Sequence, residues 1–112
     1  MGYRVVDAGL FEGRRKPIGT ELEPAVLRFN QFDSAPGQEG FEHGEAESGQ
    51  GEVYVVLRGS GVLRVDGEEV SLALGRYVLV TPESRRQVVA GPEGISYVVF
   101  GAAAKDQAPS SG

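Results

Sequence analysis

The chain has 112 residues, a formal net charge of −5 and no cysteine. This length fits a single domain, the missing cysteines exclude disulfides and zinc–thiolate sites, and the negative charge argues against a nucleic-acid partner. The sequence contains no apolar run of the roughly 18 residues that a membrane helix needs, and its N-terminus lacks the apolar stretch of a secretory signal. We therefore expect a cytoplasmic protein that does not insert into membranes.

The first half of the chain predicts two strands separated by loops. Residues 3–7 (YRVVD) and 25–33 (AVLRFNQFD) are rich in strand-forming side chains. Residues 11–24 contain glycines and prolines and predict a loop. Its basic trio at residues 14–16 (RRK) is most simply a solvated surface, and alternatively a contact for an acidic ligand or partner. Residues 34–51 are polar, acidic and glycine-rich, and are most simply a second solvated loop.

The second half carries the strongest strand pattern. Residues 52–58 (EVYVVLR) and 62–66 (VLRVD) predict two strands, and the intervening Gly59-Ser60-Gly61 predicts a tight turn between them. Further short strands, separated by turns that include residues 91–94, are expected at residues 69–72, 76–81, 86–90 and 95–101. The small and polar residues 102–112 predict a loose tail, which leaves a single domain over residues 1–101.

Together these patterns predict an all-β protein. No useful helical period appears, and about seven or eight short strands joined by frequent turns are typical of a sandwich or barrel. The pair Gly59-x-Gly61 is not followed by a helical pattern, so it is not a dinucleotide-binding or phosphate-loop motif.

Residues 36–61 (PGQEGFEHGEAESGQGEVYVVLRGSG) resemble the first motif of the cupin superfamily. That motif runs Gly, five residues, His-x-His, three or four residues, Glu, six residues, Gly. Gly37, His43, Glu52 and Gly59 match it, with Glu45 at the second histidine and a longer spacer before Glu52.

The second cupin motif is kept in spacing more than in residue type. It runs Gly, five residues, Pro-x-Gly, two residues, His, three residues, Asn. Gly75 starts it here, but Thr81, Glu83, Arg86 and Ala90 replace its Pro, Gly, His and Asn. The resemblance covers about residues 30–101 and implies an antiparallel double-stranded β-helix, a jelly-roll barrel with a pocket in its mouth.

The resemblance also implies where a cofactor would bind. Typical cupins hold a divalent metal on three histidines and one glutamate, and the matching positions are His43, Glu45, Glu52 and Arg86. Arginine stays protonated and cannot ligate a cation. Either the first three residues bind a metal such as iron, manganese, nickel or zinc, or Arg86 replaces the metal by pairing with a carboxylate.

Three functions stay open on this basis. The first is a binding module whose pocket, built from His43, Glu45, Glu52, Tyr54 and Arg86, takes a small polar or anionic metabolite anchored by Arg86. The second is a metal-dependent dioxygenase or isomerase of the cupin type, and the third is a structural barrel without a ligand. We also expect a homodimer, because an edge strand at residues 3–7 would be free to pair with a second copy.

Overall fold

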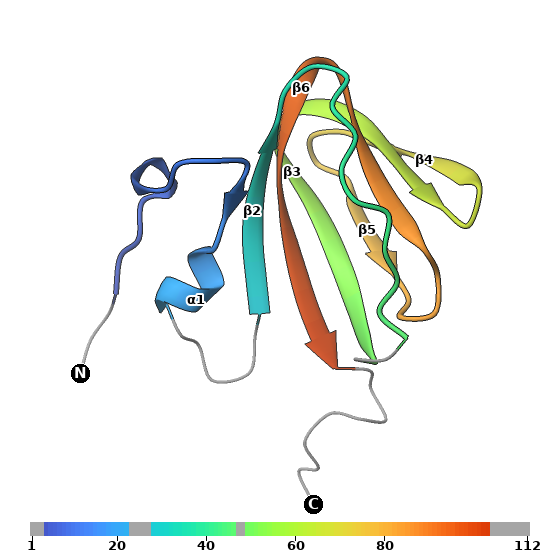
Figure 1. Cartoon of the computed structure of the whole chain (residues 1–112), viewed down its shortest axis with the longest axis horizontal. Coiled ribbons are helices and arrows are strands. Elements are labelled where there is room, and N and C mark those ends of the chain that lie inside the picture. Colours follow the sequence, from blue (N-terminus) through green and yellow to red (C-terminus); the bar gives the residue numbers. More distant parts are fainter. Residues whose placement is uncertain (1–3, 23–27, 47–48, 104–112) are drawn as a thin grey trace, which may run out of the picture.

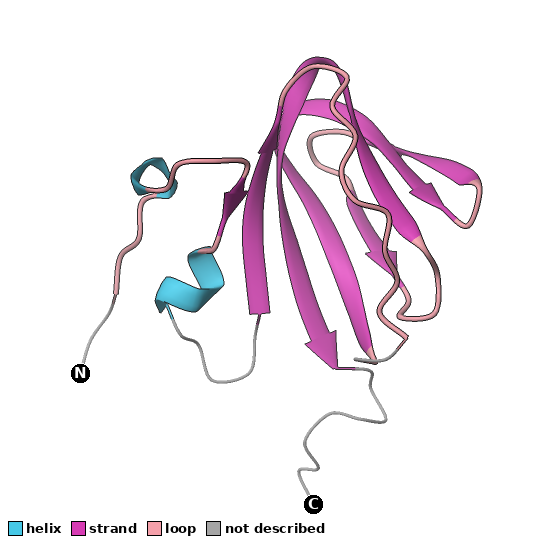
Figure 2. Ribbon diagram, in the orientation of Figure 1, coloured by secondary structure: helices cyan, strands magenta, loops and turns pink. Residues whose placement is uncertain are grey.

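The computed structural model describes residues 4–22, 28–46 and 49–103. Strands dominate the fold (Figures 1 and 2), and the predicted all-β, antiparallel class is confirmed. In chain order the elements are a 3₁₀ helix η1 (Ala8–Leu10), β1 (Arg15–Lys16), α1 (Ile18–Leu22), β2 (Arg28–Ser34), β3 (Gln50–Val65), β4 (Glu68–Leu72), β5 (Tyr77–Val80) and β6 (Arg86–Ala103).

The fold is organised around two long strands, β3 and β6, which pair antiparallel from Gln50↔Ala103 to Val65↔Arg86. Different neighbours extend this pair at its two ends. The first part of β3 also pairs with β5, and its last part pairs with β4. The last part of β6 pairs with β2, which in turn pairs with β1.

The pair of long strands is strongly curved. Glu52 pairs with Gly101 near one end of the ladder, and Val65 pairs with Arg86 at the other. In a straight ladder Glu52 and Val65 would lie about 43 Å apart. The side chain of Arg86 nevertheless reaches Glu52, with Nε 3.8 Å from Oε1. The two ends of the ladder therefore curl toward each other and enclose the interior.

The curvature coincides with irregular pairing in the middle of β3. The register shifts between Val56 and Arg58 and again between Gly59 and Gly61. Such irregularities bend a strand and strengthen its twist. They also change which residues point inward: Tyr54 and Val56 are buried before the break, and Leu63 is buried after it.

The predicted turn at residues 59–61 is therefore wrong, and so is the predicted turn at residues 91–94. The chain continues through both glycine-rich segments as a single strand. Gly59 and Gly94 do adopt positive φ, of 77° and 80°. A hairpin turn and a bulge both use glycine for positive φ, so the sequence pattern does not reveal whether the chain reverses.

The N-terminal part also differs from prediction. Residues 4–7 form no strand, so the edge strand expected for dimer formation is not present there; residue 3 lies outside the described residues. The expected loop at residues 11–24 contains β1 and α1. Strand β2 begins at Arg28, within the predicted strand, whose residues 25–27 are not described.

The last strand also continues beyond residue 101, where the sequence predicted its end. Strand β6 includes residues 102 and 103, which the sequence placed in the tail, and residues 104–112 lie outside the described residues. Among the residues that the structure describes, no helix has the length and apolar character needed to cross a membrane.

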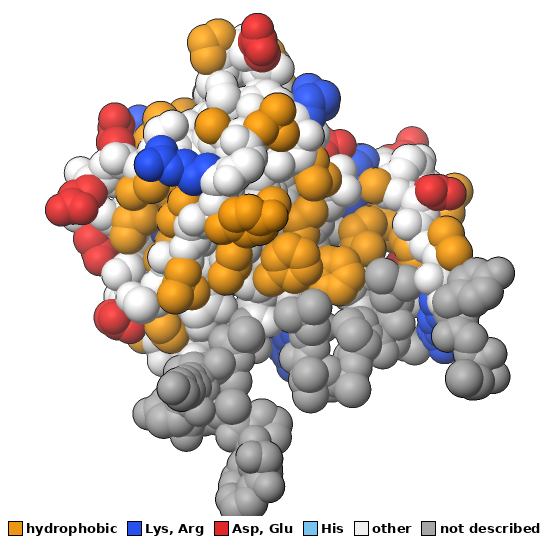
Figure 3. Space-filling model, turned by 180° about the vertical axis from the view of Figure 1, so that it is seen from behind, with side chains coloured by type: hydrophobic (Ala, Val, Ile, Leu, Met, Phe, Trp, Pro, Cys, Tyr) orange, Lys and Arg blue, Asp and Glu red, His pale blue; other side chains and the backbone are white. Residues whose placement is uncertain are grey.

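The core lies on the inner side of the curved strands. Leu63, Leu72 and Ile95 are completely buried, and the remaining buried apolar side chains surround them. The outer side is also rich in apolar residues, since Tyr77 and Leu79 of β5 are exposed next to β3. Figure 3 shows that hydrophobic side chains also gather on the face of the molecule opposite to the one seen in Figure 1.

The close approach of β3 to β6 generates a stability prediction. A Cβ on Gly59 would collide with the carbonyl oxygen of Gly94, and one on Gly61 would lie 2.5 Å from the Val89 carbonyl oxygen. We expect Gly59→Val and Gly61→Val each to lower the free energy of unfolding by about 1–3 kcal/mol, because the backbone must shift or strain. Urea unfolding measures this change. Gly9→Val is the control, since a Cβ there meets nothing within 4 Å; equal midpoints for all three variants would contradict the close packing at the bend.

Candidate functional site

Three elements bring the predicted site residues together. Glu52 and Tyr54 lie on the inner face at the start of β3, two residues apart. His43 and Glu45 belong to the irregular segment before β3, and Arg86 is the first residue of β6. Mutual backbone hydrogen bonds between His43 and Arg86, of 2.9 and 2.7 Å, fasten this segment to β6. The Glu45 amide also donates to the Pro82 carbonyl oxygen at 2.8 Å.

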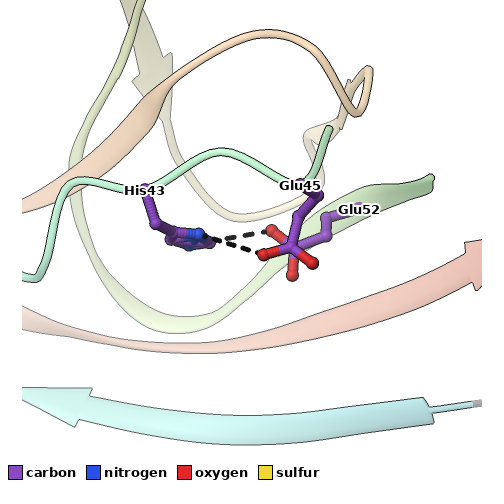
Figure 4. Close-up of side chains that lie close together, drawn as sticks. All are labelled: His43, Glu45 and Glu52. Atoms are coloured by element: carbon purple, nitrogen blue, oxygen red, sulfur yellow. Dashed lines mark ion pairs between the residues drawn. The ribbon is translucent and has the colours of Figure 1, made fainter. Parts of the chain in front are cut away.

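The side chains of His43, Glu45 and Glu52 face one another, as Figure 4 shows. The Nδ1 atom of His43 lies 3.4 Å from a carboxylate oxygen of Glu45, and its Nε2 atom lies 3.9 Å from Oε1 of Glu52. One potential ligand atom from each residue lies within 4.8 Å of the others. A single imidazole and two carboxylates can bind a divalent transition metal, so these three residues could hold a metal ion.

Arg86 lies behind Glu52 and is almost completely buried, with 1% of its surface exposed. One terminal nitrogen, Nη2, donates to the carbonyl oxygens of Val80 and Thr81 at 3.2 and 2.7 Å. Its Nε lies 3.8 Å from Glu52 Oε1, which is an ion pair but too long for a hydrogen bond. Within the described part of the chain, neither Nε nor Nη1 finds a hydrogen-bond partner. Arg86 thus supplies a buried positive charge next to Glu52 and retains capacity for a further acceptor.

Tyr54 provides the shortest contact to Glu52. Its hydroxyl donates to Oε1 at 2.9 Å, and only 3% of the residue is exposed. Burial and the neighbouring negative charge of Glu52 raise the pKa of Tyr54 far above its ordinary value, because both disfavour a phenolate. Tyr54 therefore remains a hydrogen-bond donor that orients the Glu52 carboxylate.

Four of these residues, His43, Glu52, Tyr54 and Arg86, line a cavity of about 700 Å³. Glu45, which the sequence also predicted in the pocket, is not among the lining residues of this cavity. Its wall includes side chains that the sequence did not single out as site residues, among them Arg28, Asn30, Gln50, Phe32 and Tyr97. Phe32 and Tyr97 stack with their ring centroids 5.3 Å apart. Arg28 and Asn30 share the inner face of β2 with Phe32, because alternate residues of a strand point the same way. That alternation is the signal that could have identified them.

Comparisons with known proteins extend this description. No protein-family model matches the chain, and no curated protein matches it in sequence. A cupin protein from Bacteroides fragilis has a similar structure, with a TM-score of 0.81 over 99% of this chain and 92% of its own, at 19% sequence identity. A cupin 2 conserved barrel domain protein from Salinispora arenicola matches 71% of this chain and 66% of its own, with a TM-score of 0.63 and 27% identity.

A third similar structure is a predicted oxalate decarboxylase from Thermotoga maritima. It has a TM-score of 0.65 and 17% identity, over 77% of this chain and 74% of its own. At such identities the likeness concerns the fold. The motif spacing, the curved antiparallel strands and these similar structures agree that the chain is a small cupin-fold domain.

Proposed function

We propose that the protein binds a small anionic metabolite in its cavity through a divalent metal ion held by His43, Glu45 and Glu52. The observation that carries this proposal is the convergence of three ligand atoms within 4.8 Å, two of them from the cavity-lining residues His43 and Glu52. Glu52 belongs to β3, whereas His43 and Glu45 belong to the segment fastened to β6. The closure of the barrel brings the two parts together.

The surroundings of Glu52 support metal binding. Tyr54 donates to its Oε1 atom, and Arg86 places a positive charge 3.8 Å from the same oxygen. Metal ligands are commonly oriented by such neighbouring groups, which fix the direction of the ligand atoms. These two contacts fix the direction in which the Glu52 carboxylate points.

The charge of the cluster supports an anionic ligand. Two carboxylates and one arginine leave a single net negative charge, with the ligating imidazole neutral. A divalent ion would reverse this to a net positive charge, which favours an anion. Three protein ligands also leave coordination positions open for that anion.

Catalysis at the same centre is the second candidate. A histidine and two carboxylates with open coordination positions are the ligand type of metal-dependent oxygenases. A dioxygenase or isomerase activity would use the same His43, Glu45 and Glu52 group, with the metal acting on the bound anion. The binding proposal is a precondition of this activity and is tested first.

Metal binding is tested by titrating the protein with Ni²⁺ in a calorimeter. We expect one site in the wild type and at least a tenfold loss of affinity, about 1.4 kcal/mol, in Glu52→Gln, because a charged ligand is lost. Glu69→Gln removes an exposed carboxylate on β4 and is the matched control. Equal affinities of Glu52→Gln and wild type would place the metal elsewhere or exclude this site.

Anion binding is tested with the Mn²⁺-loaded protein. Butyrate should lower the relaxation rate of water protons, because a carboxylate that reaches the ion displaces its water. The effect should saturate with one butyrate per ion. An unchanged relaxation rate in a protein that binds Mn²⁺ would contradict the anion part of the proposal.

A separate prediction concerns Arg86. Arg86→His removes a fixed positive charge beside Glu52 and supplies an imidazole at the fourth position of the ligand set. We expect Ni²⁺ affinity to rise at least tenfold, about 1.4 kcal/mol. Arg85→His is the control, since the Arg85 side chain is exposed and pairs with Glu42 outside the cavity. A similar gain in both variants, or none in Arg86→His, would show that position 86 does not face the metal. Thermal unfolding of Arg86→His measures the stability that is lost with the hydrogen bonds to the Val80 and Thr81 carbonyl oxygens.

A further inference from the structure

Across the inner face, Glu52 of β3 is in register with Gly101 of β6, and Gly101 is in register with Arg28 of β2. Residues in register on adjacent antiparallel strands point to the same side of the sheet. Glu52 and Arg28 therefore face the same cavity from either side of a glycine. With strands spaced about 4.8 Å apart, their backbones are separated by about 10 Å.

Gly101 places no side chain of its own between Glu52 and Arg28, and the side chain of Gln50 lies over it. A Cβ built on Gly101 would lie 3.0 Å from the side-chain oxygen of Gln50, so even a methyl group would crowd this part of the wall. In the next row of the same face, Tyr54, Val99 and Asn30 stand side by side, and Val99 fills the middle. The row that contains the carboxylate and the arginine therefore differs from its neighbour, because its middle residue has no side chain.

Arg28 is an exposed residue at the start of β2 that also lines the cavity. Within the described ranges, the side chains of Arg28 and of two other cavity-lining arginines, Arg14 and Arg15, form no ion pair with a carboxylate. Arg14 instead contacts the Ser34 hydroxyl at 3.4 Å and lies over the Phe32 ring. In a protein of net charge −5, one wall of the cavity is therefore positively charged.

We propose that Arg28 is a second anion-binding residue and that the ligand is a short dicarboxylate. One carboxylate binds at the His43, Glu45 and Glu52 centre, and the other pairs with Arg28 on the far side of Gly101, next to the Gln50 side chain. The planar guanidinium of arginine suits a carboxylate, because two parallel N–H groups match its two oxygens. This inference rests on the proposed metal-dependent anion binding and adds the class of ligand.

The test compares succinate with butyrate, which has the same chain length and only one carboxylate. Wild type, Arg28→Gln, Arg28→Lys and Arg76→Gln are each loaded with Mn²⁺, and both anions are titrated by water-proton relaxation. Arg76→Gln is the matched control, because Arg76 is exposed outside the cavity, where it donates to the Ser71 carbonyl. Affinity for Mn²⁺ itself is measured first in all four proteins.

We expect succinate to bind the wild type and Arg76→Gln at least tenfold more tightly than butyrate. Arg28→Gln should abolish this preference without changing Mn²⁺ or butyrate affinity, and Arg28→Lys should retain part of it, since the charge remains. A preference that survives in Arg28→Gln, or that is missing in a wild type that binds Mn²⁺ and butyrate, overturns the role of Arg28 alone. Failure to bind Mn²⁺ overturns the proposed function, and the dicarboxylate inference falls with it.

Discussion

The antiparallel ladder between β3 and β6 is the constraint on which the rest of the structure depends. These strands supply most of the buried apolar residues, and β2, β4 and β5 all attach to them. Irregular pairing near Gly59 and Gly61 lets the ladder curl. Without that curvature, Arg86 and Glu52 would lie at distant points of a flat ribbon, and neither the enclosed core nor the cavity would exist.

Glu52 belongs both to the packed interior of the fold and to the proposed site. A carboxylate in a largely buried position is costly unless charged or hydrogen-bonding groups compensate it. Tyr54 donates to Glu52, Arg86 lies close to the same oxygen, and His43 approaches from the opposite segment. The groups that stabilise the carboxylate in the fold therefore also orient it as a ligand. Arg86 in place of a histidine changes the charge of the centre while keeping its position.

Two kinds of side chain surround the Glu52 carboxylate. His43 and Glu45 face it from one side and provide groups for a cation, while Arg28 stands two strands away and provides a group for an anion. The similar solved structures share the fold at low identity, so they do not specify a ligand for this chain. The proposed function therefore rests on the side chains of this cavity, since cupin-like barrels can present different side chains at the same positions.

Strand composition and motif spacing determined the all-β class and the grouping of His43, Glu45 and Glu52, because local residue preferences and spacing are properties of the chain itself. They did not determine that residues 59–61 continue a strand, since a glycine turn and a glycine bulge require the same backbone angles. They also missed Arg28, which is an ordinary residue of β2 until β6 aligns it with Gly101 and Glu52. Register between strands distant in sequence depends on long-range packing, so only the tertiary structure decided which charges share the cavity.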